Sequence, residues 1–502
     1  MSTWGGGYVT DIAYVNGWYR EQSPLIMALA CLLGGVASPM PGPDDEVSYL
    51  ELGCGHGFGA MATAASNPNW RVTAIDFNPA HVVAARERAA EAGLDNITFI
   101  EADLASLADD HARARLVPMA DFVSMHGVWS WVPVVVRTGI VNLLRDKVQP
   151  GGVVHVSYNA LPAWGNALGF QRLIRSVGRQ RVGRSDRQAG EGLQFLRELF
   201  AADALQLQRS YVVQALMERL GELPLTYLTH EYMNASWAPC FMADVAEALA
   251  DAKLEFAASA SLHENFPELT LNDAQRALSQ RFDDPMLREL IKDHCLERLL
   301  RHDVYVRGAR HIPPPQRDAA LADLSIVLHV RPEEMPREGN FPAGKAELNP
   351  KFYQPVARAL ANGPRRVRDL LQLPEIEGKR DNPAELIGVL VGAALADVAL
   401  RPDAPPSAVA RRFNRMAARW LRPIEVPDRP MAAASYRLGM PAPASVLDLT
   451  VLEYTMAGEG TVEALMRCFA TVATINDEAK LGEVLSAAIE NRLPRLRAAG
   501  VL

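Results

Sequence analysis

The stretch that decides the fold is Ser48-Tyr-Leu-Glu-Leu-Gly-Cys-Gly-His-Gly-Phe-Gly59, followed by Arg71-Val-Thr-Ala-Ile-Asp76. It predicts a strand, a glycine-rich turn, a helix, a second strand and a carboxylate at the end of that strand. Gly53, Gly55 and Gly57 can adopt backbone angles closed to other residues, which lets main-chain N–H groups approach a ligand. The terminal carboxylate would then accept hydrogen bonds from the ribose hydroxyls of a nucleotide-like cofactor.

Three acidic residues stand at or near the carboxyl ends of the predicted strands. Glu51 lies two positions before the first glycine, where it would repel a diphosphate but attract a sulfonium and an amino group. Asp76 ends the second strand, and Asp103 ends a third that begins at Asn96. Carboxyl ends of parallel strands meet at one edge of an open α/β sheet, where such folds bind ligands. These three carboxylates favour S-adenosylmethionine (SAM) over NAD as the cofactor. The alternative interpretation is that the glycines and carboxylates belong to an ordinary βαβ turn.

Further residues complete the expected cofactor site. Cys54 lies between two glycines, where small size explains it better than a role as nucleophile. His126 follows a fourth strand that begins at Ala120, and it is a candidate for general base or for cofactor binding. The expected cofactor-binding residues are Glu51, Gly53, Cys54, Gly55, Gly57, Asp76, Phe77, Asp103, Leu104 and His126.

The stretch from Tyr49 to Pro162 resembles class I SAM-dependent methyltransferases. Within it, His126-Gly-Val-Trp-Ser-Trp-Val-Pro133 and Val156-Ser-Tyr-Asn-Ala-Leu-Pro-Ala-Trp164 are similar to the HGVYSWVP and SYNxxPGW segments of bacterial methyltransferases with a methyltransferase regulatory domain. That group includes the rickettsial-type protein-lysine methyltransferases. Tyr227-Leu-Thr-His-Glu-Tyr-Met-Asn234 resembles a landmark of the regulatory region. The resemblance implies an α/β fold with a Rossmann-like class I methyltransferase sheet. The spacing of apolar residues along the rest of the chain predicts a helical middle region and an α+β to mostly helical C-terminal region.

Aromatic residues after the fourth and fifth strands lie on the rim where the methyl group must point. Aromatic faces hold an ammonium group by cation–π attraction, and Asn159 could orient an amine. The expected substrate-binding residues are Tyr14, Trp129, Trp131 and Trp164, and the expected catalytic residues are His126, Tyr158 and Asn159. If Trp129 belongs to neither pocket nor core, the acceptor site is expected between Tyr14 and the helical middle region.

Composition excludes several other classes of function. Five cysteines without CxxC pairs indicate neither a zinc site nor a disulfide framework, and methyl transfer by in-line displacement needs no metal. A net charge of −8 gives no general attraction to nucleic acid. The N-terminus lacks the pattern of a signal peptide, and the apolar stretches are too short to span a bilayer. We therefore expect a cytoplasmic protein that binds neither nucleic acid nor membrane.

The 502 residues are expected to form several domains. Three prolines at His311-Ile-Pro-Pro-Pro-Gln316 predict a break without regular helix. Four aromatics of the N-terminal extension, Tyr8, Tyr14, Trp18 and Tyr19, either form a lid or pack on the sheet. The expected domains are an N-terminal extension (1–44), a SAM-binding catalytic domain (45–164), a helical regulatory or substrate region (165–312), a winged-helix-like module (317–402) and a helical C-terminal region (403–502).

These patterns together predict a SAM-dependent methyltransferase with protein lysine as its first acceptor. One alternative is an O- or N-methyltransferase acting on a saccharide or secondary metabolite. Another is a non-catalytic SAM-binding interaction module, which would keep the cofactor site without a working acceptor pocket. The expected partners are a protein or small-molecule methyl acceptor, with a homodimer as the assembly considered.

Overall fold

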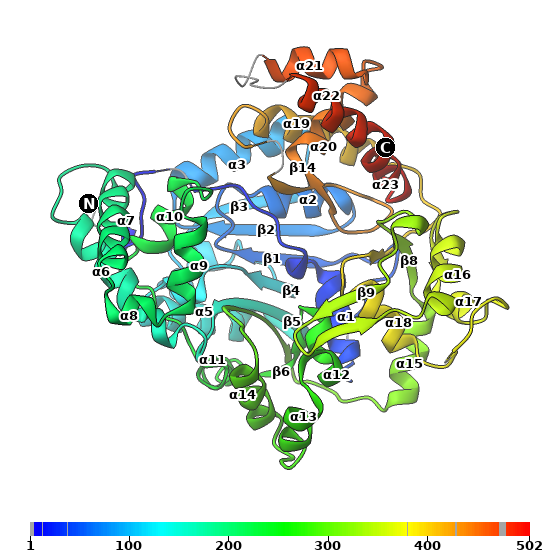
Figure 1. The fold of residues 1–502 in the computed structure, drawn as a ribbon, viewed down its shortest axis with the longest axis horizontal. Helices are drawn as coiled ribbons and strands as arrows, with labels where there is room; N and C mark the ends of the chain where they lie inside the picture. Colours follow the sequence, from blue (N-terminus) through cyan, green and yellow to red (C-terminus); the bar gives the residue numbers. More distant parts are fainter. Residues whose placement is uncertain (1–4, 13, 38, 379, 427–428, 471–477) are drawn as a thin grey trace.

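A seven-stranded sheet forms the centre of the molecule, in the order β3-β2-β1-β4-β5-β7-β6 (Figure 1). Its strands are β1 (Ser48–Leu52), β2 (Arg71–Asp76), β3 (Ile97–Glu101), β4 (Ala120–Met125), β5 (Val148–Asn159), β6 (Leu254–Ser259) and β7 (Leu300–Arg307). Strands β1 to β5 pair in parallel, whereas β7 runs antiparallel to β5 and to β6. The expected Rossmann-like sheet is therefore confirmed.

The computed structural model describes residues 5–12, 14–37, 39–378, 380–426, 429–470 and 478–502. The parts of the expected N-terminal extension, winged-helix-like module and C-terminal region that fall on residues 1–4, 13, 38, 379, 427–428 and 471–477 lie outside the described residues. Within the described residues, every helix is too short or too polar to cross a bilayer.

The two faces of the sheet carry separate apolar cores, because side chains alternate along each strand. Tyr49 of β1 belongs to one core, and Leu50 and Leu52 belong to the other. The first core is covered by α1 (Pro24–Leu33), α2 (Phe58–Ser66) and α3 (Pro79–Ala92), and the second by α5 (Val134–Lys147) and α11 (Met242–Ala250). The sheet is thus covered on both sides, as a parallel sheet must be.

Strand β7 lies in a region that was expected to be helical. Its charged residues do not show the apolar pattern of a buried strand, so the sequence did not predict it. Arg301 is buried, yet its guanidinium is bonded to three carboxylates: Nη1 donates to Asp293 at 2.6 Å, Nε to Asp303 at 2.9 Å and Nη2 to Glu289 at 2.8 Å. Asp293 and Glu289 belong to α14 (Pro285–Cys295). Buried charges are tolerated when they are paired in this way, so a charged sequence forms a central strand here.

The middle region adds a helical lobe beside the carboxyl edge of the sheet (Figure 1). It comprises α6 (Leu168–Gly178), α7 (Ser185–Ala201), α8 (Leu205–Gln208), α9 (Tyr211–Arg219) and α10 (Leu225–Tyr232), with α12 (Pro267–Thr270) and α13 (Asp273–Ser279) further along. Val9 and Ile12 of the N-terminal segment are buried in the apolar core of this lobe. The N-terminal segment and α10 are therefore held together next to the sheet edge.

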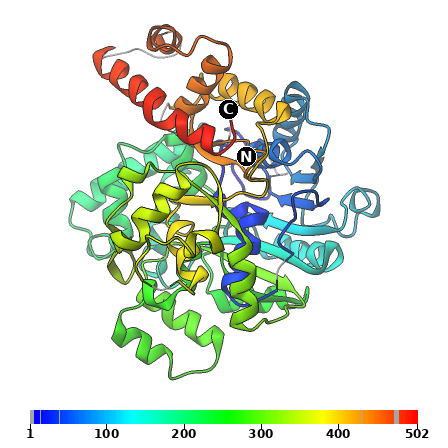
Figure 2. The same cartoon turned by 90° about the vertical axis from the view of Figure 1, so that its right-hand side faces the viewer.

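The last third of the chain packs on the core formed by α1 to α3. Contrary to the expected break, α15 (Pro314–Asp323) begins directly at two prolines, because proline is well tolerated in the first turn of a helix. Figure 2 shows this yellow part of the chain nearest the viewer, with the orange and red C-terminal helices above it. The elements are β8 (Ser325–Leu328), β9 (Glu338–Phe341), β10 (Gly344–Glu347), α16 (Pro350–Leu360), β11 (Arg365–Arg366), α17 (Val367–Leu371), α18 (Pro383–Leu390), β12 (Ala396–Val398), α19 (Ala408–Leu421), β13 (Pro430–Ala433), β14 (Ala442–Ser445), α20 (Val446–Met456), α21 (Val462–Ala470), α22 (Glu478–Ala487) and α23 (Leu493–Ala498).

Contacts across the expected domain boundaries are extensive. Helix α19 packs against α2 and α3 of the catalytic region. In the N-terminal segment, Arg20 pairs with the buried carboxylate of Asp397 in β12, and Asn16 donates to Glu425 at 3.1 Å. The winged-helix-like assignment and the domain limits stay predictions; the structure shows one continuous core shared by the N-terminal and C-terminal parts.

Candidate functional site

The glycine-rich turn between β1 and α2 has the backbone angles that its sequence predicted. Gly53, Gly55 and Gly57 have φ values of 73°, 54° and 73°, in the left-handed region. A Cβ at Gly53 would lie 2.5 Å from a methyl carbon of Val128, and one at Gly57 would lie 2.5 Å from the ring of Phe99. Angle and space both require glycine here, so the turn passes close to Phe99 in β3 and to Val128 in the segment after β4.

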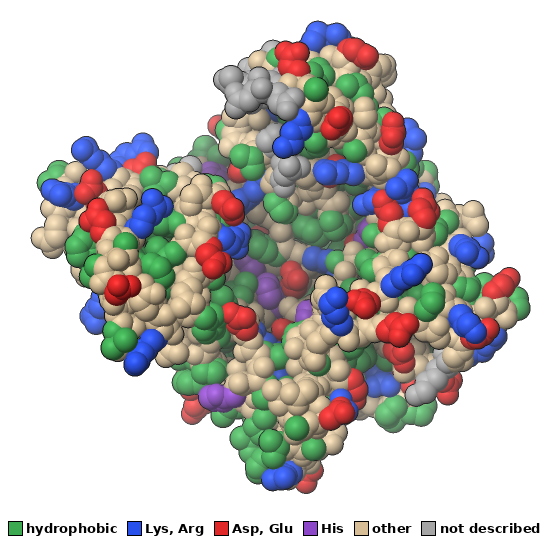
Figure 3. All heavy atoms as spheres, in the orientation of Figure 1, with side chains coloured by type: hydrophobic (Ala, Val, Ile, Leu, Met, Phe, Trp, Pro, Cys, Tyr) green, Lys and Arg blue, Asp and Glu red, His purple; other side chains and the backbone are tan. Residues whose placement is uncertain are grey.

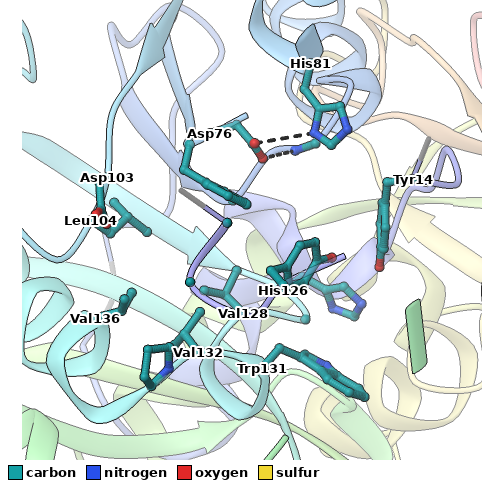
Figure 4. A pocket seen from close by; sticks show the side chains of 18 residues that line it. Tyr14, Asp76, His81, Asp103, Leu104, His126, Val128, Trp131, Val132 and Val136 are labelled. Carbon is teal, nitrogen blue, oxygen red and sulfur yellow. Dashed lines mark hydrogen bonds and ion pairs between the residues drawn. The ribbon is translucent and has the colours of Figure 1, made fainter. Parts of the chain in front are cut away.

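Asp76 ends β2 and fixes the shape of this turn. Its Oδ2 accepts from the Gly55 amide and its Oδ1 from the Asn78 amide, each at 2.8 Å. His81 in the first turn of α3 lies 3.4 Å from Oδ1 (Figure 4). A carboxylate has about four lone-pair sites, so acceptor capacity remains for the hydroxyls of a ribose.

Glu51 lies beneath the glycine turn at the end of β1. The side chain is buried, and the Tyr49 hydroxyl donates to its Oε2 at 3.3 Å. Burial raises the pKa of Glu51 to about 7, and the neighbouring Asp76 also raises it, while the Tyr49 hydrogen bond acts in the opposite direction. A cationic ligand group nearby would lower this pKa again and keep Glu51 ionised.

A cavity that is partly open to solvent lies over this carboxyl edge, and the space-filling view shows the molecule hollowed near its centre (Figure 3). The lining of the cavity includes seven of the expected cofactor-binding residues and two of the expected substrate-binding residues, Tyr14 and Trp131. In Figure 4, Asp103, Leu104 and Val136 lie at one end, Tyr14 and Trp131 at the other, and Asp76 and His81 above. The lining residues are Gly5, Gly6, Tyr8, Tyr14, Gly53, Gly55, Asp76, Phe77, His81, Asp103, Leu104, His126, Gly127, Val128, Trp131, Val132, Pro133 and Val136.

Three expected cofactor residues, Glu51, Cys54 and Gly57, support the turn but are absent from the lining of the cavity. The structure therefore brings Gly53, Gly55, Asp76, Phe77, Asp103, Leu104 and His126 together in one cavity. Burial raises the pKa of the Cys54 thiol well above its usual value. This is the opposite of what activates a nucleophilic cysteine.

His126 stands between the cavity and a row of buried histidines. Its Nδ1 lies 3.0 Å from Ser157 Oγ, and the Tyr19 ring stacks on the imidazole with centroids 3.5 Å apart. The ring centroid of His302 lies 5.4 Å from that of His126, and His302 Nδ1 is hydrogen-bonded to His155 Nε2 at 3.2 Å. Burial, reinforced by His302, holds the pKa of His126 well below its usual value. The imidazole is therefore neutral at physiological pH; both sequence-based interpretations, base and cofactor ligand, remain open.

Of the four expected substrate-binding residues, Tyr14 and Trp131 line the cavity and Trp129 and Trp164 are buried away from it. Trp129 is 2% exposed and packs in the core formed with α5. Trp164 donates from Nε1 to the Leu299 carbonyl at 2.8 Å. Both side chains therefore support the fold around the site, and their expected contact with the acceptor stays a prediction that their positions do not favour.

Two of the expected catalytic residues, Tyr158 and Asn159, also lie behind the cavity wall. The Tyr158 hydroxyl donates to Asp303, and burial together with that carboxylate raises its pKa well above the usual value. Asn159 accepts from the Trp237 indole at 3.4 Å, and its backbone N–H donates to Ser130 Oγ at 2.8 Å. These groups hold the end of β5 in place; a direct role in the reaction is an untested prediction.

Several lining residues were not expected from the sequence. His81 lies in the first turn of α3, which begins at Pro79 after the N-cap residue Asn78. This helix-start signal comes directly after Asp76 in the sequence, so it could have predicted His81 at the site. Val128 and Val132 line the cavity from the His126–Pro133 segment, whose valines were not named as site residues, and Val136 lines it from the first turn of α5. Tyr8, named only as a lid candidate, forms part of the wall and contacts Phe77 edge-on at 5.8 Å.

Comparisons with known proteins agree with this architecture. The family described as "Methyltransferase domain" matches residues 50–154, and the family described as "Predicted methyltransferase regulatory domain" matches residues 224–307. An uncharacterized protein of Synechocystis sp. is 33% identical over 376 residues, which are 75% of this chain and 73% of that protein. An uncharacterized protein of Rickettsia prowazekii is 25% identical over 45% of this chain and 39% of its own length.

Solved structures show the same fold over almost the whole length. PKMT2 from Rickettsia typhi matches with a TM-score of 0.68 and 15% identity, covering 97% of this chain and 99% of that one. The same protein in complex with AdoHcy matches with a TM-score of 0.70. The sheet order, the glycine turn with its acidic strand ends and both domain matches place the chain in one family: it belongs to the SAM-dependent methyltransferases that carry a methyltransferase regulatory domain.

Proposed function

We propose that this enzyme transfers the methyl group of SAM to the side-chain amine of protein lysine residues. The observation that carries the proposal is the composition of the cavity end opposite Asp103, where Tyr14 and Trp131 lie beside His126 (Figure 4). Tyr8 also lines the cavity, and we call these three side chains the aromatic wall. Aromatic faces attract an ammonium or a methylated amine by about 0.5–2 kcal/mol per contact. The resemblance to rickettsial-type protein-lysine methyltransferases and the fold likeness to PKMT2 support the same acceptor.

The residues of the cavity fit SAM in one direction. We place the adenine at Asp103 and Leu104, the ribose hydroxyls at Asp76 and the methionine end over the glycine turn, above Glu51. SAM bound in this way supplies an electrophilic methyl group on a sulfonium. Backbone amides of the turn would hold the amino-acid end, and the Glu51 carboxylate buried behind the turn would attract its amino group through space. The aromatic wall would then lie on the side from which the acceptor arrives.

The chain contributes mainly alignment and the exclusion of water. In-line displacement needs the nucleophile, the methyl carbon and the sulfur on one line, and holding them there supplies a large part of the rate enhancement. Val128, Val132 and Val136 make one side of the cavity apolar. The N-terminal segment with Tyr8 and Tyr14 covers the other side. A lysine ammonium must also lose a proton before attack, and the neutral imidazole of His126 is one acceptor for it.

Labelled SAM tests the proposal directly. The full-length enzyme is incubated with methyl-labelled SAM and a lysate separated into protein, glycan and small-molecule fractions, and labelled protein is hydrolysed to amino acids. We expect label in mono-, di- or trimethyl-lysine. Label confined to glycans or small molecules would favour the saccharide or secondary-metabolite alternative, and binding of SAM without transfer to any fraction would favour the non-catalytic module.

A further inference from the structure

His81 is a buried histidine in the wall of the cavity, in the first turn of α3. Its side chain is 9% exposed, and within the described ranges its buried Nδ1 atom has no hydrogen-bond partner. The Oδ1 atom of Asp76 lies 3.4 Å from Nδ1 (Figure 4), which is longer than an N–H···O hydrogen bond. A buried polar atom without a partner costs free energy, so Nδ1 is suited to a group that a ligand brings into the cavity.

The other ring nitrogen of His81 determines where the ring proton lies. Asn78 is the N-cap residue of α3, and its Oδ1 accepts from the Ala80 amide at 3.0 Å. The Nδ2 group of Asn78 therefore faces His81 Nε2, 3.3 Å away, and an amide nitrogen can only donate. Nε2 is thus the acceptor in this hydrogen bond. Since a neutral imidazole carries its single proton on one nitrogen, the proton of His81 lies on Nδ1, and the unpartnered atom is a donor.

Two neighbours hold the imidazole of His81 in this orientation. The Asn78 amide holds one edge of the ring, as described. His56, from the glycine-rich turn, contacts the ring with centroids 4.5 Å apart. Burial lowers the pKa of His56 to about 4, and the nearby His81 acts in the same direction, so His56 is neutral and packs without charge repulsion. The Nδ1 edge of His81 is therefore held beside Asp76.

Asp76 by itself offers a ribose only hydrogen-bond acceptors. Its two carboxylate oxygens accept from the Gly55 and Asn78 amides and keep lone pairs for ribose O–H groups. A hydroxyl is a donor and an acceptor at once, so a ribose hydroxyl that donates to Asp76 still needs a donor for its own oxygen. One oxygen can lie within hydrogen-bond distance of both Asp76 Oδ1 and His81 Nδ1, because these two atoms are only 3.4 Å apart.

We propose that His81 is a cofactor-binding residue whose Nδ1–H donates to the ribose hydroxyl that Asp76 Oδ1 accepts. Asn78 is a positioning residue, because it acts only through the opposite nitrogen of the ring. Together, Asp76 and His81 select a hydroxyl at that ribose carbon, since only a hydroxyl donates to the first and accepts from the second. This inference rests on the proposed position of the ribose at Asp76, and it does not depend on the identity of the methyl acceptor.

Calorimetry on the full-length protein, with S-adenosylhomocysteine and its 2′-deoxy and 3′-deoxy analogues, tests this assignment. His81→Phe keeps a ring but removes the donor, and should lower the affinity for S-adenosylhomocysteine about five- to tenfold. For one of the two deoxy analogues, the same variant should change the affinity by less than about twofold, because the hydroxyl that His81 binds is already missing. His81→Asn should keep most of the affinity for S-adenosylhomocysteine, since its amide nitrogen also donates and is as many bonds from Cβ as Nδ1.

NMR of the histidine ring nitrogens gives a readout other than affinity and needs no variant of His81 that binds the cofactor. In the natural protein, we expect the proton of His81 on Nδ1, with Nε2 unprotonated. Asn78→Ser keeps a side-chain oxygen for the N-cap of α3 but removes the donor to Nε2. This variant should therefore move part of the His81 proton population to Nε2. A proton on Nε2 in the natural protein would overturn the assignment.

Asp76→Ala, measured with the same three ligands, separates the two ways in which the inference can fail. If the loss of affinity in Asp76→Ala depends on a ribose hydroxyl but the loss in His81→Phe is equal for all three ligands, or is absent, His81 alone is refuted. If neither variant distinguishes the deoxy analogues from S-adenosylhomocysteine, the ribose does not lie at Asp76, and the role of His81 is refuted with it. Both outcomes leave the labelled-SAM test of the acceptor unaffected, because no methyl group is transferred in these measurements.

Discussion

Trp129 and Trp131 stand two residues apart in one 3₁₀ turn, but the structure predicts opposite consequences for their loss. Trp129 is 2% exposed, the Arg137 guanidinium lies 5.7 Å above its ring, and Arg137 donates to its carbonyl at 2.8 Å. Truncating such a buried tryptophan to alanine costs about 3–5 kcal/mol of unfolding free energy. For Trp129→Ala we therefore expect a large loss of stability, with methyl transfer and cofactor binding lowered in proportion to the folded fraction.

Trp131→Ala is the matched control. It removes the same side-chain atoms as Trp129→Ala, but from the wall of the cavity instead of the core. The side chain is half-buried and its main aromatic contact is Trp237, with centroids 6.0 Å apart. Its truncation should cost about 1–2 kcal/mol, because only part of its surface is removed from water. S-adenosylhomocysteine affinity should stay within about threefold, while methyl transfer falls. Urea unfolding, calorimetry and transfer of labelled methyl are measured on both variants. A stable Trp129→Ala that has lost methyl transfer alone would refute this reasoning and restore Trp129 to the acceptor pocket.

Three shorter predictions follow from the same geometry. Asp76→Ala should lower S-adenosylhomocysteine affinity by about 2–4 kcal/mol, from two lost charged hydrogen bonds; calorimetry on the folded variant would contradict this if affinity is unchanged. Gly53→Ala should cost more stability than Gly308→Ala, since both have left-handed angles but only the first meets a neighbour, 2.5 Å away; equal melting temperatures would refute the steric argument. The pKa of Glu231 is raised in the folded state to about 7, so the folded state binds its proton more tightly and stability falls as pH rises from about 4 to 7. Glu231→Gln should therefore be more stable than the natural protein by about 1–3 kcal/mol above pH 7, with the difference vanishing near pH 4; equal pH profiles of thermal unfolding would contradict it.

The cofactor side of the site could be predicted because its signals are local in sequence. The glycine turn must have left-handed angles, and Asp76 must follow the second strand, whatever the rest of the chain does. The acceptor side was predicted less well. Trp129 and Trp131 follow the same strand with the same residue type, and only the packing of α5 decides that one is buried and the other faces the cavity.

Strand β7 and Glu231 show a second reason why sequence patterns fell short. Both depend on the folded chain: Arg301 is tolerated inside the sheet because α14 supplies carboxylates, and the raised pKa of Glu231 comes from burial that only folding provides. Neither feature has a periodicity or spacing that could be read along the chain. The prediction that the three prolines exclude regular helix was wrong for another reason: two of them occupy the first turn of α15.

The N-terminal segment links the acceptor side of the cavity to the last third of the chain. Tyr8 and Tyr14 line the cavity, whereas Arg20, a few residues later, pairs with Asp397 in β12, which also pairs with His329. Any movement of the C-terminal part that breaks the Arg20 pair would release the segment that forms the aromatic wall, but would leave Asp76 and the glycine turn in place. With the acceptor at the aromatic wall, as proposed, binding of the donor and binding of the acceptor are separable, since the first depends on the sheet edge and the second on how the N-terminal segment is held.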